Sequence, residues 1–215
     1  LDMRGDREGA EREIQEALRL DANIADAHYN LGIALVERGD HEGAEREIRE
    51  ALRLDPEHAA GHYSLGAALS NRGDLEGAER EIREALRLNP DVARAQYNLG
   101  VVLGKRGDQG GAERAYREAL RLDPDDAAAH NNLGAVLGMR GDLEGAAREV
   151  REALELNPDV AGAHCNLGVI LSKSGDHEGA EREIREALRL KPDAAGAHYS
   201  LGVILGKRGD QEGAK

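Results

Sequence analysis

Apolar and small residues recur along the chain with the period of an α-helix. Between residues 25 and 38 they fall at positions i, i+3, i+4 and i+7, as His28, Leu31, Gly32 and Leu35. Between residues 41 and 54 the same face is formed by Ala44, Ile48, Ala51 and Leu52. This spacing places each set on one side of a helix, with charged residues on the other side. The pattern therefore predicts two amphipathic helices in this stretch.

Turn-forming residues separate these two helices. Arg38-Gly39-Asp40 stands between them, where Gly39 suits the left-handed end of the first helix and Asp40 suits the N-cap of the second. Asp55-Pro56 follows the second helix and ends it, because a residue that precedes proline is disfavoured in the helical region. We therefore predict a helical hairpin.

The hairpin is repeated every 34 residues. Arg-Gly-Asp begins at Arg4, Arg38, Arg72, Arg106, Arg140 and Arg208, and Ser174-Gly175-Asp176 fills the missing copy. The prolines share one slot, as Pro56, Pro90, Pro124, Pro158 and Pro192. A fixed period of this length is typical of a solenoid. The pattern predicts a single array over 1–215, with a leading second helix in 1–24, full repeats at 25–58, 59–92, 93–126, 127–160 and 161–194, and a trailing partial repeat in 195–215.

Small residues mark where the paired helices approach each other. Gly32 and Ala44 leave room for close packing, whereas the sequence offers no packing reason for the glycine at Gly43. On the outer face, the spacing predicts ion pairs four residues apart, between Glu45 and Arg49 and between Arg46 and Glu50.

Composition limits the core and the classes of partner. The chain has no Phe or Trp, and hydrophobic residues still make up 40% of it, so we expect a thin core of small side chains. The net charge of -13 disfavours non-specific binding to nucleic acid or to an anionic membrane. No segment reaches the length of a membrane span, and no leader pattern opens the chain, which favours the cytoplasm without assigning a compartment.

The repeat resembles the tetratricopeptide repeat. The family pattern W-x2-L-G-x2-Y, A-x3-F and P maps onto His28, Leu31, Gly32, Leu35, Ala44, Ile48 and Pro56, with His for Trp, Leu for Tyr and Ile for Phe. The resemblance covers essentially the whole chain. It implies an all-α fold, a right-handed α-solenoid superhelix, in which the first helix of each repeat lines a concave groove.

Two files of residues are the candidate peptide-binding site. A polar residue precedes each Leu-Gly pair, as Asn30, Ser64, Asn98, Asn132, Asn166 and Ser200. This file is similar to the asparagine ladder with which some tetratricopeptide domains hold the backbone of an extended peptide, since an amide offers both a donor and an acceptor. The neighbouring slot holds Tyr29, Tyr63, Tyr97 and Tyr199, with Asn131 and Cys165 in the other two repeats. Tyrosine suits a binding surface, and packing against the next repeat is an equally good interpretation.

Two other motifs have a simpler structural interpretation than a functional one. The histidine file, His28, His62, His130, His164 and His198, stands where the family packs its tryptophan, and the distance between helices disfavours metal binding. Each residue of Arg-Gly-Asp has a role in a turn, which disfavours an adhesion motif. No repeat carries the lysine, asparagine and arginine that form the carboxylate clamp of the family. The arginines, together with Lys105, Lys173 and Lys207, predict a basic rim of the groove.

These features predict a scaffold that binds a protein or peptide. We find no nucleophile–base pair, phosphate-binding loop or metal constellation, so we expect no enzyme activity, no cofactor and no metal. Repeat arrays normally have polar capping helices, and neither end of this chain carries one, so a module that stacks end to end into oligomers is an alternative. A second alternative is that the chain is a docking arm of a larger enzyme.

Overall fold

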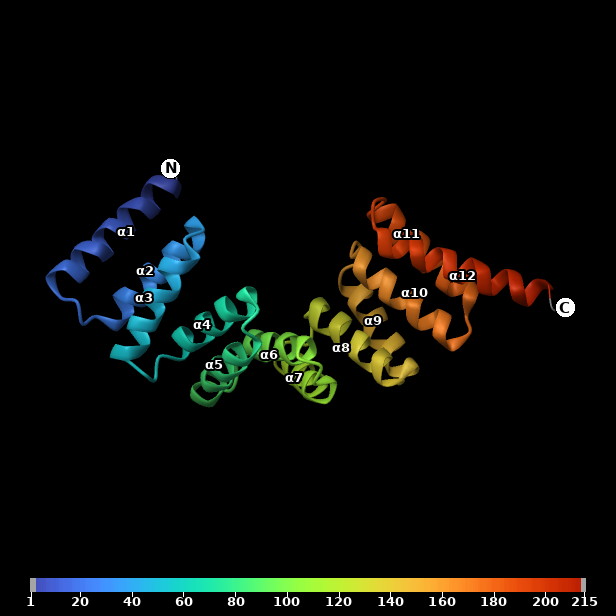
Figure 1. Ribbon diagram of the computed structural model, residues 1–215, viewed down its shortest axis with the longest axis horizontal. Helices are drawn as coiled ribbons and strands as arrows, with labels where there is room; N and C mark the ends of the chain where they lie inside the picture. The colour runs from blue at the N-terminus through green and yellow to red at the C-terminus, as the bar shows by residue number, and fades with distance from the viewer. Residues whose placement is uncertain (1–2, 214–215) are drawn as a thin grey trace. The chain divides into compact units, whose positions relative to one another are not determined.

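A computed structural model describes the backbone of residues 3–213 and the side chains of residues 9–209. Within this range the chain forms twelve α-helices and no strand (Figure 1). The helices belong to two compact units, Leu1–Val102 and Leu103–Lys215. The all-α class and the succession of short helices that the periodicity predicts are confirmed.

The N-terminal unit is built from helix hairpins. Its helices are α1 (Met3–Leu20), α2 (Ala25–Arg38), α3 (His41–Leu54), α4 (Ala59–Arg72) and α5 (Leu75–Leu88), followed by α6 (Ala93–Lys105), in which the division between the units falls. Helices α2 and α3 pack together as one hairpin and α4 and α5 as the next, and α3 also contacts α4. Each helix is thus packed against its neighbours in sequence, as in a solenoid.

The C-terminal unit repeats the same arrangement. It contains α7 (Gln109–Leu122), α8 (Ala127–Arg140), α9 (Leu143–Leu156), α10 (Ala161–Ser174), α11 (His177–Leu190) and α12 (Ala195–Gly213). The hairpins are α8–α9 and α10–α11, and α7 and α12 pack at either side of them. The first helices α8, α10 and α12 also contact one another in succession. They therefore form one continuous face of this unit.

The turn inside each hairpin explains a glycine that the sequence left unexplained. Gly39 ends α2 with a φ of 84°, and the Asp40 carboxylate caps α3 by accepting a hydrogen bond from the Gly43 amide at 2.9 Å. A Cβ atom on Gly43 would lie 2.4 Å from Asp40 Oδ2. A side chain at this position would therefore displace the capping carboxylate.

The first and last Arg-Gly-Asp copies do not form the predicted turn. Residues 4–6 lie inside α1, and residues 208–210 lie inside α12. In both places the backbone stays helical through the tripeptide. The prediction from sequence was wrong at these two copies.

The core is thin because the paired helices touch through their small residues. Ile82 and Ile184 are completely buried, and Ala44 and Ala78 are almost completely buried. A Cβ atom on Gly134 would lie 2.4 Å from Val150 Cγ2 and 2.9 Å from the Ala146 carbonyl oxygen. This contact confirms the close approach predicted for the Leu-Gly slot. Among the described residues, no helix is both long enough and apolar enough to cross a bilayer.

Candidate functional site

The predicted polar file follows the first helices of the hairpins. Asn132 lies on α8, Asn166 on α10 and Ser200 on α12, and all three are half-buried. In the N-terminal unit Ser64 and Asn98 are half-buried and Asn30 is exposed. In the C-terminal unit these side chains stand on helices that contact one another, so the unit brings its part of the file together.

Hydrogen bonds join the polar file to the tyrosine file of the preceding repeat. Asn98 Nδ2 donates to Tyr63 Oη at 2.9 Å. Asn166 Nδ2 donates to Asn131 Oδ1, also at 2.9 Å. In each case the two residues are 35 positions apart in the sequence. The two files were predicted as separate sets of ligand-facing side chains, and the structure joins them.

These bonds leave one side of each amide available. Asn98 and Asn166 each donate one N–H, and among the described residues their Oδ1 atoms have no partner. The donated bond also fixes the plane of the amide. A fixed carbonyl oxygen is a prepared acceptor for a peptide N–H, because less side-chain freedom is lost on binding.

The tyrosine file has different surroundings along the chain. The Tyr29 ring packs against His58 with centroids 4.7 Å apart, and Tyr63 accepts the bond from Asn98. Tyr97 is half-buried, whereas Tyr199 on α12 is 76% exposed. The packing interpretation therefore describes Tyr29 and Tyr63, and Tyr199 has the open surface that a binding residue needs.

The histidine file holds the hairpins together. His164 Nδ1 lies 2.7 Å from Glu183 Oε2 on the paired helix, and its Nε2 lies 3.0 Å from the Pro158 carbonyl oxygen. The same pair of contacts occurs at His28, His62 and His130. Both ring nitrogens are thus engaged by protein oxygens, one on the paired helix and one in the loop that precedes the first helix. No group of His, Cys, Asp and Glu in the described part of the chain is arranged to hold a metal ion.

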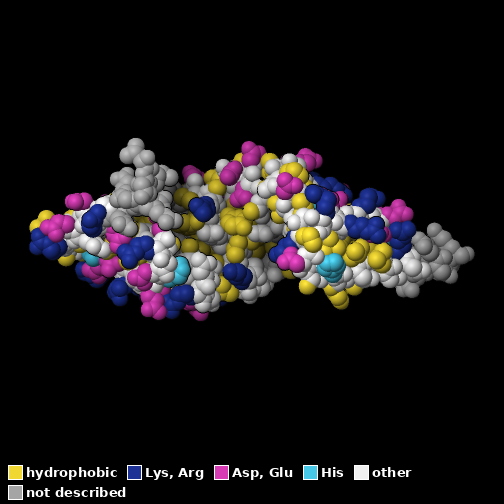
Figure 2. Space-filling model, turned by 90° about the horizontal axis from the view of Figure 1, so that it is seen from above, with side chains coloured by type: hydrophobic (Ala, Val, Ile, Leu, Met, Phe, Trp, Pro, Cys, Tyr) yellow, Lys and Arg dark blue, Asp and Glu magenta, His cyan; other side chains and the backbone are white. Residues whose placement is uncertain are grey.

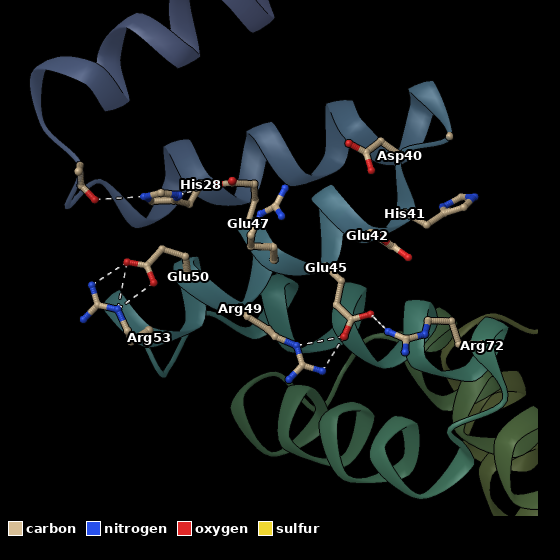
Figure 3. A pocket seen from close by; sticks show the side chains of 13 residues that line it. His28, Asp40, His41, Glu42, Glu45, Glu47, Arg49, Glu50, Arg53 and Arg72 are labelled. Carbon is tan, nitrogen blue, oxygen red and sulfur yellow. Dashed lines mark hydrogen bonds and ion pairs between the residues drawn. The ribbon is translucent and has the colours of Figure 1, made fainter.

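The arginine of Arg-Gly-Asp bonds to the repeat before it. Figure 3 shows the Glu45 carboxylate of α3 between Arg49 of its own helix and Arg72 of α4. Burial raises the pKa of Glu45, but the hydrogen bonds and charges of Arg72 and Arg49 outweigh it, so the pKa lies below its ordinary value. The same contact joins Arg38 to Glu11, Arg140 to Glu113 and Arg208 to Glu181. The turn arginines are therefore structural cations between repeats.

Two details of the charged surface differ from the sequence prediction. The Glu45–Arg49 pair forms at 2.7 Å, but Glu50 pairs with Arg53 instead of Arg46, three residues along the helix. Figure 2 shows cationic and anionic side chains mixed over the visible face. Because the described turn arginines are paired, the lysines are the cations of the predicted basic rim that form no ion pair with a described residue.

Comparisons with known proteins identify the repeat. The family model of the cilia and flagella-associated protein 70 C-terminal domain matches residues 2–202. No curated protein matches the chain in sequence. Among solved structures, YrrB, described as a tetratricopeptide repeat protein with an unusual peptide-binding site, has a TM-score of 0.77 at 24% identity over 87% of this chain and 96% of its own.

Two other structures show the same fold. MamA from Desulfovibrio magneticus RS-1 has a TM-score of 0.73 at 26% identity, covering 80% of this chain and 97% of its own. PilF from Pseudomonas aeruginosa has a TM-score of 0.79 at 22% identity, covering 91% and 89%. The chain therefore belongs to the family of the cilia and flagella-associated protein 70 C-terminal domain, a tetratricopeptide repeat family.

Proposed function

We propose that the first helices of the hairpins bind an extended segment of another polypeptide, with the asparagine file holding its backbone. The observation that carries the proposal is the state of Asn98 and Asn166, whose amides are fixed by one bond to the preceding repeat and keep a carbonyl oxygen without a partner in the described structure. Peptide N–H groups are the natural donors for such acceptors. The similarity in fold to YrrB, a protein with a peptide-binding site, supports the same interpretation.

The energetics require more than the backbone contacts. One hydrogen bond contributes about 0.5–1.5 kcal/mol, while association costs about 4–15 kcal/mol. The remaining affinity must come from side-chain contacts with the exposed apolar positions of the same face, among them Val169, Tyr199 and Val203. We propose binding rather than catalysis as the activity of this surface.

Alanine at Asn98 and Asn166 together should weaken binding of a peptide selected on this chain from a random display library. Loss of two neutral hydrogen bonds, about 1–3 kcal/mol, corresponds to an increase in Kd of about 5- to 150-fold. Fluorescence anisotropy with the labelled peptide measures it, and circular dichroism confirms that the variant is folded. Asn89→Ala, in the loop after α5, is the matched control and should leave Kd unchanged.

A second variant separates ligand binding from the inter-repeat bond. Tyr63→Phe removes the acceptor of the Asn98 amide but leaves the Asn98 carbonyl oxygen in place. We expect a smaller rise in Kd than for Asn98→Ala, because Tyr63→Phe keeps the Asn98 oxygen that accepts the N–H of the peptide. Equal affinity of the asparagine variant and the parent chain would exclude the file as the binding site.

Self-association is the second candidate, favoured by apolar side chains that the described structure leaves open on α1 and α12. Leu20 is 73% exposed, Tyr199 76% and Leu205 42%. These faces have the character of surfaces that normally lie against another repeat. Sedimentation velocity over a range of concentrations should show an increase in mass that Leu205→Glu abolishes. A monomer at every concentration excludes this candidate.

A further inference from the structure

Lysine is rare in this chain, and most of it occupies one slot. The sequence contains five lysines, of which Lys105, Lys173 and Lys207 occupy the same position of three 34-residue frames. All three lie in the C-terminal unit. The corresponding positions of the N-terminal unit hold Glu37 and Asn71. The lysine slot is thus a property of one unit and not of the repeat.

The lysine slot lies on the same side of the helix as the asparagine file. Lys173 follows Asn166 by seven residues on α10, and Lys207 follows Ser200 by seven residues on α12. Seven residues make about two helical turns, a rise of about 10 Å. Each of these helices therefore presents a polar group and, two turns on, an ammonium group along one face.

The charge of these lysines is not neutralised by the protein. Lys173 and Lys207 are exposed, and no ion pair joins either of them to a described residue. Arg208, which follows Lys207 directly in the sequence, behaves differently, since it is paired with Glu181. In a chain of net charge -13, the lysine slot is a local cationic surface on the proposed binding face.

We infer that the C-terminal unit binds an acidic extended peptide, whose Asp or Glu side chains contact Lys173 and Lys207 while its backbone contacts the asparagine file. The inference deepens the proposed function and rests on it. Packed neighbouring helices lie about 8–10 Å apart, and an extended chain in the polyproline II conformation rises about 3.1 Å per residue and places every third side chain on the same side. An acidic residue at about every third position would therefore meet successive lysines.

A peptide fits this surface better than a nucleic acid does. A nucleic acid carries a charge at every phosphate, so the net charge of -13 repels it more strongly than a peptide with a few carboxylates. Binding of single strands also relies on aromatic platforms, whereas in this unit the tyrosine slot holds Asn131 and Cys165 before Tyr199. We therefore make nucleic acid an outcome of the test.

The test compares three synthetic peptides of one length, with Glu, Gln or Lys at every third position in an otherwise identical neutral sequence. We expect the Glu peptide to bind about fivefold more tightly than the Gln peptide at about 0.05 M salt, and the difference to shrink at about 0.5 M. Lys173→Gln with Lys207→Gln should remove this preference. Arg151→Gln with Arg182→Gln changes the net charge equally at exposed outer-helix positions and should keep it.

A gain of affinity provides the converse test. Met139 holds the lysine slot on α8 and is 63% exposed, so Met139→Lys adds a cation without disturbing the core. The variant should bind the Glu peptide about two- to threefold more tightly and leave the Gln peptide unchanged.

The outcomes separate the two proposals. Equal binding of the Glu and Gln peptides overturns the lysine inference and leaves peptide binding standing. Failure of all three peptides to bind, even at high concentration, counts against both. If an oligothymidylate displaces the Glu peptide at the same concentration of negative charges, the lysines bind anions in general. This result would also overturn the inference.

Discussion

Replacing Gly134 by alanine should lower the free energy of unfolding of the C-terminal unit by about 2 kcal/mol. The new Cβ would lie 2.4 Å from Val150 Cγ2 and 2.9 Å from the carbonyl oxygen of Ala146. A side chain can rotate away from such a contact, but the carbonyl belongs to α9, so the two helices must separate. Urea unfolding followed by circular dichroism measures the change.

The same slot on α12 supplies the control. Gly202 stands where Gly134 does, two repeats further along, and a Cβ atom there would meet nothing within 4 Å. Alanine at Gly202 should therefore be neutral or should stabilise the chain by up to about 1 kcal/mol through its greater helix propensity. Equal destabilisation by the two alanines would mean that helix packing does not dictate glycine at Gly134.

Most of the fold could be predicted from the sequence because the information is local and repeated. Helix faces, the turn glycine and the N-cap aspartate each depend on residues within one hairpin, and each recurs in several repeats. The close approach at the Leu-Gly slot was predictable from side-chain size alone. The predicted turn was wrong only at residues 4–6 and 208–210, where the backbone continues as helix.

Contacts between repeats were the part that sequence reasoning missed. The bonds from Arg72 to Glu45 and from Asn98 to Tyr63 join residues 27 and 35 positions apart, a separation that no helix periodicity reveals. The sequence nevertheless contains a signal for these contacts, in the repeats that depart from the common pattern. Ser174 replaces the turn arginine in the one frame where Ala147 replaces the glutamate.

The histidine slot carries the same signal. Gln96 replaces the histidine in the one frame where Ala115 replaces its glutamate partner. Paired exceptions of this kind indicate that two residues act as a unit, because each residue loses its bonding partner when the other is replaced.

The inter-repeat bonds also determine which residues remain for a ligand. They remove the paired turn arginines from the predicted basic rim, and they fix the amides of Asn98 and Asn166, whose carbonyl oxygens have no partner among the described residues. What remains on the first helices of the C-terminal unit is the carbonyl oxygen of Asn166 and the ammonium groups of Lys173 and Lys207, none of which has a partner among the described residues. The candidate site is therefore defined by the contacts that the repeats do not use among themselves.

The Glu45–Arg72 contact should stabilise the N-terminal unit as a pair. Arg72→Ser, which copies Ser174, should lower the free energy of unfolding by about 1–2 kcal/mol, since the covered carboxylate of Glu45 keeps only Arg49 (Figure 3). Because folding lowers the pKa of Glu45, its contribution is present above the unfolded-state pKa and is lost as the pH falls through the folded-state pKa. The parent chain and the variant should thus converge in stability in acid.

A double substitution tests whether the two residues are coupled. In the background of Glu45→Ala, which copies Ala147, Arg72→Ser should cost less than about 0.5 kcal/mol, because the exposed arginine no longer has a buried carboxylate to neutralise. The converse pair, Ala147→Glu with Ser174→Arg, should stabilise the contact between α9 and α10, where Arg151 already stands four residues after Ala147. Ala147→Glu alone should be less stable than the pair. If Arg72→Ser has the same cost with and without Glu45, the paired exceptions in the sequence do not reflect an energetic coupling between repeats.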